Sequence, residues 1–449
     1  MAAPETATAP ELRDRPRRAL AIVIGIVFLD LLGFGVVIPI LPFYVRSFGV
    51  TDVVIGLLAA SYSIMQFLFA PILGRLSDAH GRRPVLMLSL AGSVIAWTVF
   101  GVATEFAAIG VWAGIGVLFV SRMVAGAMGG NIATAQAYIA DITPSDRRAG
   151  ALGLIGAAFS LGFIFGPALG GLLASDGVVT LARRSLPAAV PATAFSLPSF
   201  AAAVLSLLAL VCTALFLPEP DRNRGPNRRI TLVGQFVEAL RDQSLRGLVI
   251  AFFVVSVAFS GIQVMFIPFA ADIYGYTATQ TALLLTYIGV LGTLNQGLLV
   301  GWLSRRYPSD RLAIAGATLL GVALAVLPFA PTIGRSVMPA ALTTVQPWVT
   351  PELGMLLVVL AGLSIGNGLL NVSLSTLVST SASADRQGTA FGVTQGAGSL
   401  GRTIGPPTMA ALYVIAVPSP FVAGAVLILP VIAILLVRGD GIATREAGP

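Results

Sequence analysis

The sequence predicts an all-α integral membrane protein in which twelve transmembrane helices form two pseudo-symmetric six-helix bundles. Three observations predict it: an apolar composition, twelve apolar runs of bilayer length, and an internal repeat between the two halves. Of the 449 residues, 56% are hydrophobic and only 10% are charged, whereas soluble domains hold roughly 25% charged residues. Because this polar fraction is too small to cover the outside of a soluble protein, apolar side chains must face lipid.

Apolar runs of sufficient length occur twelve times along the chain. A transmembrane helix needs about 20 mostly apolar residues. The predicted spans lie near residues 19–44, 53–73, 85–104, 108–140, 149–173, 200–217, 248–270, 281–303, 312–330, 353–378, 388–417 and 421–437. Arg122 interrupts the fourth run, but a division there would leave two short pieces without a turn between them. We therefore predict one long helix over 108–140.

The basic residues predict the orientation of the spans. All 27 are Arg. With the N-terminus inside, 21 of them fall in the tails and in the loops on the cytoplasmic side, and two lie within spans. The opposite loops hold four, namely Arg46, Arg183, Arg184 and Arg335. Because short cytoplasmic loops are enriched in Lys and Arg, we expect both termini to be cytoplasmic and the protein to lie in the cell (inner or plasma) membrane.

The longest polar interruption divides the spans six and six. It covers residues 218–245 and carries several Arg. We therefore expect a cytoplasmic tail over 1–18, an N-terminal bundle over 19–217, this central cytoplasmic loop, a C-terminal bundle over 246–437 and a second cytoplasmic tail over 438–449.

The fifth span of each half is the same sequence element. Shifting the chain by 239 residues lays 146–173 over 385–412, so that Gly166 and Pro167 coincide with Gly405 and Pro406. Two parallel repeats of six helices, with a solute site between them near the bilayer midplane, are typical of secondary transporters that work by alternating access.

Missing residue types exclude several chemistries. The chain has no Lys, one His (His80) and one Cys (Cys212). Without Lys there is no phosphate-binding GxxxxGK[ST] loop and no Schiff base, and one His with one Cys cannot complete a zinc or haem site. We expect no cofactor, no metal, no enzymatic activity and no nucleic-acid partner; the basic charge serves orientation in the membrane instead.

A patterned loop follows the second span, with the sequence GRLSDAHGRRPVLML. It carries Gly74, Asp78, Gly81, Arg82 and Arg83 at fixed spacing. Glycine allows a tight turn between antiparallel helices, and Arg side chains bind acidic groups or the carboxyl ends of helices. The sequence therefore predicts a close helical turn that is held by ion pairs.

This loop resembles the signature loop of the major facilitator superfamily, although Ala79 replaces a residue that is usually basic. Residues 29–44, 121–130, 137–149 and 162–171 look like the twelve-span drug:proton antiporter branch, especially its tetracycline-type exporters. The last stretch matches the antiporter signature GxxxGPxxGG of that branch, which gives a close-packed, Pro-kinked helix. Its residues, with the second-half copies, are Gly162, Gly166, Pro167, Gly170, Gly171, Gly405 and Pro406.

The resemblance implies that Asp30 couples transport to protons. It matches the acidic residue of the first span and lies about eleven residues into the helix, hence roughly 16 Å deep. A carboxylate at that depth is costly when charged, so its protonation should follow access to water and to a cationic solute. The alternative is that Asp30 only caps or hydrogen-bonds a neighbouring helix.

Arg122 and the loop ion pairs also follow from the resemblance. Arg122 matches the arginine of the fourth span, where a buried guanidinium needs a partner. It either biases the proton affinity of a nearby carboxylate, for which Asp30 is the candidate, or it forms a static contact between helices. Asp78, Arg82 and Asp141 correspond to a cytoplasmic latch that stabilises the outward-facing state. The alternative for the latter three is a merely structural turn.

Polar and aromatic positions within the spans form the candidate substrate cavity. In the tenth span Ser364, Asn367, Asn371 and Ser375 share one helix face, which should face inward because amides in lipid are costly. Arg402 stands where the first-half copy has Phe163 and either binds an anionic group of the solute or pairs with a carboxylate. The candidates are Phe34, Gln66, Asn131, Gln263, Phe266, Tyr287, Asn367, Asn371, Gln395 and Arg402.

The leading hypothesis is a monomeric, proton-driven exporter of small amphipathic compounds such as tetracycline-like drugs, with the small-molecule substrate, protons and the lipid bilayer as its partners. A symporter that takes up a metabolite is the alternative on the same fold. A membrane enzyme or receptor without transport is the alternative from another class, but His80 and Cys212 lie in different regions and offer no nucleophile with a base.

Overall fold

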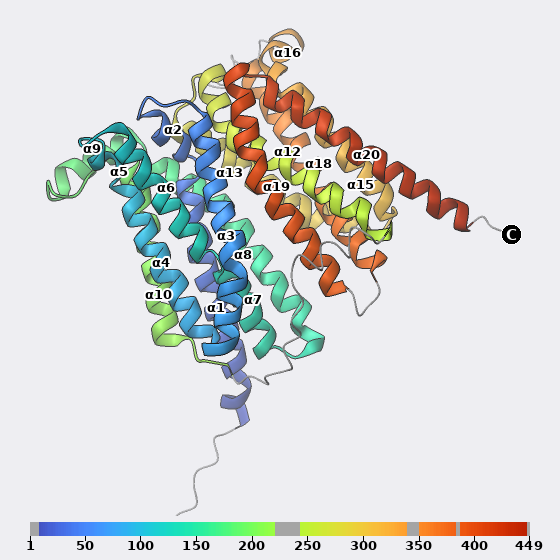
Figure 1. Ribbon diagram of the computed structural model, residues 1–449, viewed down its shortest axis with the longest axis horizontal. Coiled ribbons are helices and arrows are strands. Elements are labelled where there is room, and N and C mark those ends of the chain that lie inside the picture. Colours follow the sequence, from blue (N-terminus) through green and yellow to red (C-terminus); the bar gives the residue numbers. More distant parts are fainter. Residues whose placement is uncertain (1–8, 221–242, 339–349, 383–386, 447–449) are drawn as a thin grey trace, which may run out of the picture. The chain divides into compact units, whose positions relative to one another are not determined.

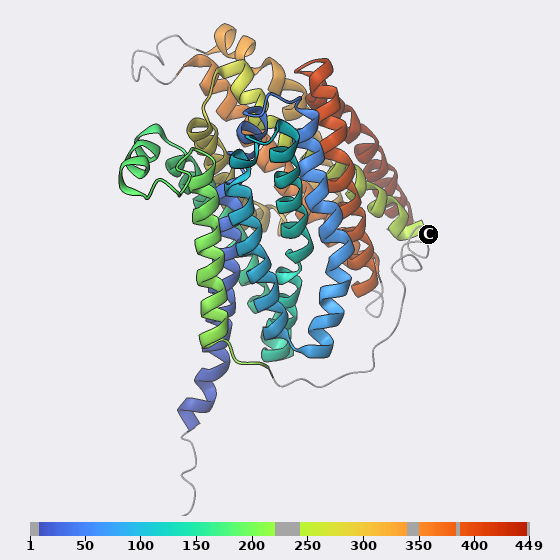
Figure 2. The ribbon, with the colours of Figure 1, turned by 60° about the vertical axis from the view of Figure 1, so that its left-hand side comes forward.

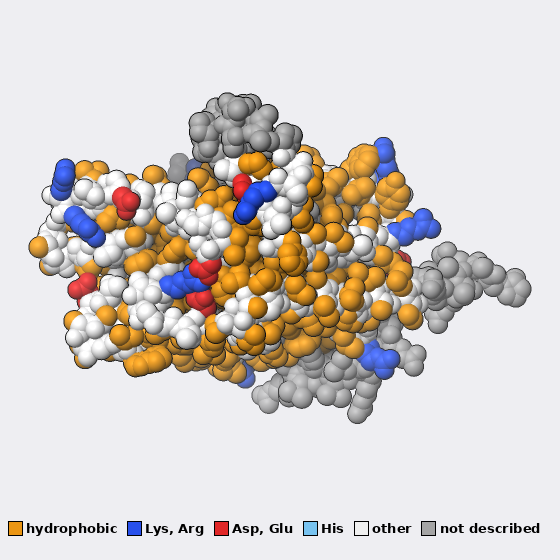
Figure 3. All heavy atoms as spheres, turned by 90° about the horizontal axis from the view of Figure 1, so that it is seen from above, with side chains coloured by type: hydrophobic (Ala, Val, Ile, Leu, Met, Phe, Trp, Pro, Cys, Tyr) orange, Lys and Arg blue, Asp and Glu red, His pale blue; other side chains and the backbone are white. Residues whose placement is uncertain are grey.

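The computed structural model describes residues 9–220, 243–338, 350–382 and 387–446, and the regular elements in these ranges are helices (Figure 1). Eleven of them are long and apolar enough to cross a membrane. The polar helix over Gln387–Ile415 supplies the twelfth predicted span. The predicted all-helical membrane architecture is confirmed. Figure 3 shows one face of the molecule, on which hydrophobic side chains predominate and charged ones are scattered.

The helices of the first half follow the predicted spans, with short helices between some of them. They are α1 (Ala9–Val37), α2 (Leu41–Arg46), α3 (Val53–His80), α4 (Arg82–Gly101), α5 (Ala103–Phe106), α6 (Val111–Met128), α7 (Asn131–Ile142), α8 (Ser145–Leu173), α9 (Asp176–Ser185) and α10 (Ser196–Phe216). In Figure 2, α10 runs beside α1, against which it packs.

The helices of the second half include two short irregular segments. They are α12 (Gln243–Tyr274), α13 (Ala278–Leu294), the π-helical η1 (Asn295–Leu299), α14 (Val300–Leu303), α15 (Ser309–Val326), the 3₁₀-helical η2 (Leu327–Phe329), α16 (Ala330–Val337), α18 (Pro351–Ser381), α19 (Gln387–Ile415) and α20 (Ser419–Glu446). The eighth span is therefore α13, η1 and α14 in succession.

Two compact units make up the chain. Unit 1 comprises Met1–Phe48, Ile64–Pro226 and Thr277–Thr286, and unit 2 comprises Gly49–Ser63, Asn227–Tyr276 and Tyr287–Pro449. They follow the two halves of the sequence except at one end of α3 and one end of α13. Within unit 2, a Cβ at Gly56 would lie 2.5 Å from the Pro406 carbonyl oxygen. Within unit 1, Thr279 Oγ1 donates a 2.8 Å hydrogen bond to the Gly171 carbonyl.

The predicted long fourth helix is interrupted, so that part of the prediction was wrong. The chain crosses as one apolar segment, but α6 ends at Met128 and α7 begins at Asn131. Gly129 and Gly130 lie at the break, and the Gly129 carbonyl accepts a 3.4 Å hydrogen bond from Gln66 Nε2. Glycine has the lowest helix propensity of any residue except proline. Two consecutive glycines therefore explain why the break lies here and not at Arg122.

Glycines of the GxxxGPxxGG stretch bring α8 against α1. A Cβ at Gly166 would lie 2.6 Å from Gly35 Cα, and one at Gly170 would lie 2.1 Å from the Val36 carbonyl oxygen. Both atoms belong to the backbone and cannot move aside as a side chain would. The helix itself runs unbroken through Pro167. Small residues allow this close backbone approach between membrane helices.

The second-half copy packs in the same way. A Cβ at Gly405 would lie 2.3 Å from the Val257 carbonyl oxygen, and one at Gly401 would lie 2.6 Å from Ser256 Cβ. α19 therefore crosses α12 as α8 crosses α1, and it also continues through Pro406. The repeat seen in the sequence corresponds to a repeated helix pair.

Candidate functional site

A carboxylate lies inside unit 1 between three helices. One oxygen of Asp30, on α1, accepts a 2.6 Å hydrogen bond from Asn131 Nδ2 at the start of α7. Ser93 on α4 makes a second side-chain hydrogen bond to it. Asn131 and Ser93 are buried, with 7% and 8% of their surface exposed. Both donors are uncharged, so they orient the carboxyl group without fixing it in the ionised state.

Arg122 lies on α6 in a setting of aromatic rings. Its guanidinium carbon is 5.7 Å from the ring centroids of both Phe34 and Trp97, and the residue is 5% exposed. A cation over an aromatic face is attracted by the negative face of the ring, by about 2 kcal/mol or more where water is excluded. Cation–π contacts therefore contribute to holding this guanidinium inside the membrane.

Helical spacing links the carboxylate to the arginine. Asp30 and Phe34 are four residues apart on α1, and Ser93 and Trp97 are four residues apart on α4, so each pair shares a helix face. The hydrogen-bonded layer around Asp30 and the aromatic layer around Arg122 are thus one helical turn apart, about 6 Å along the axis. The contacts of Asp30 and those of Arg122 therefore lie in adjacent helical turns of unit 1.

An aromatic wall continues from this site onto α8. The Phe34 and Phe163 ring centroids are 6.3 Å apart, and those of Phe159 and Phe163 are 6.4 Å apart. Phe34 therefore contacts both the Arg122 layer and the helix that carries the GxxxGPxxGG stretch. Ring pairs of this kind supply apolar area with defined geometry.

Arg82, the first residue of α4, forms the ion pair with Asp141 that the resemblance implies and a second one with Asp78 on α3 that was not predicted. Arg82 Nη1 lies 2.6 Å from Asp78 Oδ1, and Arg82 Nε lies 2.8 Å from Asp141 Oδ2. Gly81 has φ of 119°, a backbone conformation that favours glycine. By contrast, a Cβ at Gly74 would meet nothing within 4 Å, so Gly74 is not needed for close approach.

Glu219, which the sequence analysis missed, completes this network. Its two carboxylate oxygens accept hydrogen bonds of 2.7 and 2.9 Å from the backbone N–H groups of Arg82 and Arg83. These are the first residues of α4, whose N–H groups have no partner within the helix. Arg83 in turn donates to the carbonyls of Thr213 and Ala214 at the end of α10. The position of Glu219, the first acidic residue after the sixth span, was the available signal.

We expect Asp141→Asn to destabilise the protein more than Asp78→Asn. The Asp141 side chain is 25% exposed and that of Asp78 is 53% exposed. Losing the more buried partner of Arg82 should cost about 1–2 kcal/mol, and losing the exposed one less than about 1 kcal/mol. Thermal unfolding of the purified variants in detergent measures the order, with exposed Asp176→Asn on α9 as the control. An equal loss of stability in both variants would contradict the conclusion that Asp141 is the stronger partner of Arg82.

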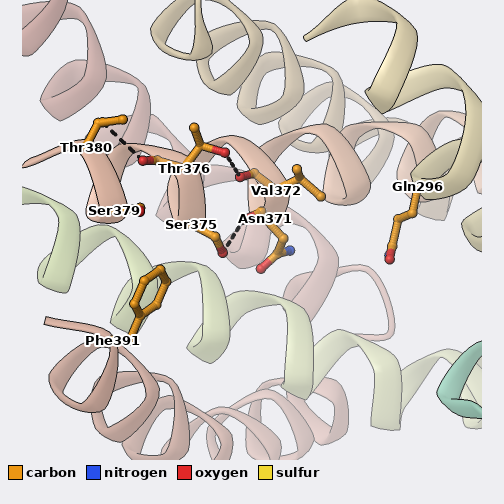
Figure 4. Close-up of a pocket in the computed structure, with 8 residues that line it drawn as sticks. All are labelled: Gln296, Asn371, Val372, Ser375, Thr376, Ser379, Thr380 and Phe391. Carbon is orange, nitrogen blue, oxygen red and sulfur yellow. Dashed lines mark hydrogen bonds between the residues drawn. The ribbon is translucent and has the colours of Figure 1, made fainter. Parts of the chain in front are cut away.

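Unit 2 contains a cavity of about 490 Å³ along the polar face of α18 (Figure 4). The face predicted from the spacing contributes Asn371 and Ser375, and Asn371 Nδ2 donates to Asn367 Oδ1 at 2.7 Å. The lining residues are Gln296, Asn371, Val372, Ser375, Thr376, Ser379, Thr380 and Phe391. Ser375, Thr376 and Thr380 donate to carbonyls of their own helix, so their oxygen lone pairs are left to accept hydrogen bonds from a solute.

A π-helical segment brings Gln296 to this cavity. In η1 the Asn295 amide donates to the Ser364 and Ile365 carbonyls of α18, at 3.0 and 3.3 Å. A Cβ at Gly368 would lie 2.2 Å from Asn295 Nδ2, so the amide occupies the space that this glycine leaves. π-helical turns occur frequently at functional sites, and the sequence periodicity did not reveal this one.

The other cavity candidates are placed as follows. Gln66 bonds to the Gly129 carbonyl, Tyr287 OH donates to the Leu357 carbonyl at 3.2 Å, and Phe266 is 4% exposed within the packing of unit 2. Gln263 and Gln395 are exposed. Tyr287 and Phe266 thus contribute to helix packing, whereas the two glutamines have accessible amides.

Arg402 lies on α19, apart from the cavity just described. Its side chain is exposed, and Nη2 donates a 2.9 Å hydrogen bond to Ser399 Oγ one turn earlier on the same helix. Among the residues that the structure describes, no carboxylate forms an ion pair with it. Static pairing with a carboxylate is therefore not its role within the described part of the chain.

Comparison with known proteins agrees with the fold and the motifs. The Major Facilitator Superfamily profile matches residues 23–406. The tetracycline resistance protein of class C from Escherichia coli is 31% identical over 405 residues, which cover 89% of this chain and 90% of that protein. Multidrug resistance protein 1 from Bacillus subtilis is 29% identical over 412 residues, covering 91% and 93%.

A solved structure is also similar to this chain in sequence and in fold. The crystal structure of the human organic anion transporter MFSD10 (TETRAN) is 25% identical in sequence, with a TM-score of 0.63, and the match covers 94% of this chain and 99% of that one. Family profile, relatives and fold agree over most of the length. The chain therefore belongs to the Major Facilitator Superfamily, a family of membrane transporters rather than enzymes.

Proposed function

We propose that this transporter exports small amphipathic compounds, tetracycline-like drugs among them, in exchange for protons by alternating access. The observation that carries the proposal is the Asp30 carboxyl group, which uncharged donors from Asn131 and Ser93 hold inside a membrane-spanning bundle. A carboxyl group that neutral donors hold at this depth can gain and lose a proton. The tetracycline and multidrug resistance relatives support export over uptake.

Arg122 has a defined place in this scheme. Its guanidinium lies one helical turn from the Asp30 layer, between the rings of Phe34 and Trp97. A buried positive charge lowers the free energy of a nearby ionised carboxylate. Arg122 therefore favours proton release from Asp30 when the site opens to water.

The Arg82 network acts as the conformational latch in this proposal. Arg82 joins Asp78 at the end of α3 to Asp141 at the end of α7, while Glu219 binds the N-terminus of α4. We take this end of the bundle as cytoplasmic because the Arg-rich loops lie there, and we take the transporter as a monomer with both termini in the cytoplasm. Ion pairs that are partly exposed can break and re-form as the conformation changes.

Everted membrane vesicles test the direction of transport. In vesicles with an acid lumen, adding tetracycline outside should release protons from the lumen if the protein exchanges the drug for protons. A pH-sensitive fluorescent dye in the lumen measures the release, and vesicles without the protein provide the baseline. A metabolite symporter, the alternative function, would release no protons on addition of tetracycline, and that result would overturn the proposal.

A further inference from the structure

Arg402 lies near the middle of a membrane-spanning helix. α19 covers Gln387–Ile415, so at ~1.5 Å per residue Arg402 is roughly 20 Å from either end. Lipid headgroups on both sides are beyond the reach of its side chain. A guanidinium that faced hydrocarbon at this depth would be very costly, so the exposed side chain must face water or a solute.

The surroundings of Arg402 in unit 2 are rich in hydroxyl groups. Ser399 Oγ accepts one hydrogen bond from the guanidinium. A Cβ at Gly398 would lie 3.3 Å from Ser256 Oγ and 3.4 Å from Arg402 Nη1, so Ser256 and Arg402 both approach this glycine. Guanidinium has five N–H donors, and the bond to Ser399 uses only one.

The internal repeat indicates what this helix face contacts. Phe163, the first-half counterpart of Arg402, lies against Phe34, whose ring also contacts Arg122. α19 packs on α12 through Gly401 and Gly405 as α8 packs on α1 through their counterparts. In unit 1, the face of α8 that carries Phe163 is thus directed toward the proposed site around Asp30 and Arg122. In unit 2 this face carries a cation in place of a phenyl ring.

The polarity of α19 agrees with this placement. α19 has the length of a membrane span, yet it is absent from the eleven apolar spans found among the described residues. Gln395, Ser399 and Arg402 occur at intervals of four and three and share one helix face. A helix with a polar stripe at mid-membrane is typical of a wall of a water-filled transport path.

We propose that Arg402 binds the anionic group of the transported compound, so that the cargo of this transporter includes amphipathic organic anions such as carboxylates. A guanidinium binds a carboxylate through two parallel N–H···O bonds, which gives both affinity and orientation. The hydroxyl groups of Ser399 and Ser256 supply further donors. The inference rests on the proposed function in that the bound anion is the cargo, and it adds the charge class of that cargo.

Two dyes that share a xanthene ring but differ in charge test the inference. Fluorescein is an anion with a free carboxylate, and rhodamine 123 is a cation whose carboxylate is esterified. Equilibrium dialysis with the purified full-length protein in detergent measures both dissociation constants. Arg402→Gln should weaken fluorescein binding at least about 10-fold, about 1.4 kcal/mol, and leave rhodamine 123 within about 2-fold. Arg402→Lys should weaken fluorescein binding less than Arg402→Gln does.

The matched control is Arg184→Gln, which removes one exposed Arg charge on α9, outside the spans. It should leave both dissociation constants unchanged. The wild type alone gives a second test, which does not depend on folding of a variant: 1-naphthoate should displace fluorescein, and its uncharged methyl ester should not. Equal loss of both dyes in Arg402→Gln, unchanged fluorescein binding, displacement by the ester, or no saturable fluorescein binding by the wild type would overturn the inference.

Binding in detergent needs no proton gradient, so the two proposals fail separately. Tetracycline-driven proton release without fluorescein binding would leave the exporter function standing and remove the anion site. Arg402-dependent fluorescein binding without proton release for either tetracycline or fluorescein would retain the anion site and overturn proton exchange.

Discussion

Asp30→Asn should lower tetracycline-driven proton release in everted vesicles by at least about 100-fold, the range expected when a group that is essential for proton transfer is lost. The asparagine side chain has almost the same shape, and its carbonyl oxygen can still accept the hydrogen bond from Asn131. It cannot take up or release a proton. The fold should therefore persist while the coupling is lost.

Two measurements separate coupling from binding in this variant. Exchange of labelled for unlabelled tetracycline across vesicles without a proton gradient should continue in Asp30→Asn, because it needs only the alternation of the loaded protein. Asp176→Asn, which changes an exposed carboxylate on α9, should behave as the wild type in both assays. If cells with Asp30→Asn resist tetracycline as well as cells with the wild type do, Asp30 is not the coupling group.

Gly166→Val should prevent α8 from packing on α1 and sharply reduce the yield of folded protein. The first carbon of the new side chain would lie 2.6 Å from Gly35 Cα, 2.8 Å from the Gly35 carbonyl carbon and 3.1 Å from the Leu32 carbonyl oxygen. All three are backbone atoms, so the helices must separate. Overpacking of this kind costs about 1–3 kcal/mol and more where the backbone has to shift.

The same helix provides a matched control. Gly156 also lies on α8, but a Cβ there would meet nothing within 4 Å, so Gly156→Val should fold with near wild-type yield. Size-exclusion chromatography and thermal unfolding of both detergent-purified variants measure the difference. Similar behaviour of the two variants would mean that the approach of α8 to α1 does not require glycine at position 166.

The sequence sufficed for features that depend on hydropathy and local spacing. Helix positions and the side-by-side polar residues of α18 follow from periodicity, and the Arg82 pair with Asp141 follows from the resemblance to the family. The repeat of 146–173 in 385–412 also anticipated that α8 and α19 pack alike. The helices and their polar faces are encoded within short stretches of sequence, so one sequence is enough to predict them.

Other features depend on which helices meet, and no local pattern encodes them. Asn131 was expected to face the solute, but its amide binds Asp30, 101 positions away in the chain. Glu219 caps α4 from a segment that follows α10. The π-helical turn at Asn295 forms where the amide finds carbonyls of α18. In each case a polar group takes a partner that only the tertiary fold supplies.

The break at Gly129 and Gly130 has a consequence for how the site responds to motion. Arg122 lies on α6 and Asn131 on α7, and two glycines join these helices. Glycine has the least restricted backbone torsions of any amino acid. A rotation about the Gly129 and Gly130 torsions would change the distance between Asn131 and Asp30 while Arg122 remained between the rings of Phe34 and Trp97. The hydrogen bond to the Asp30 carboxyl group, which we propose carries the proton, would then lengthen without exposing the Arg122 guanidinium.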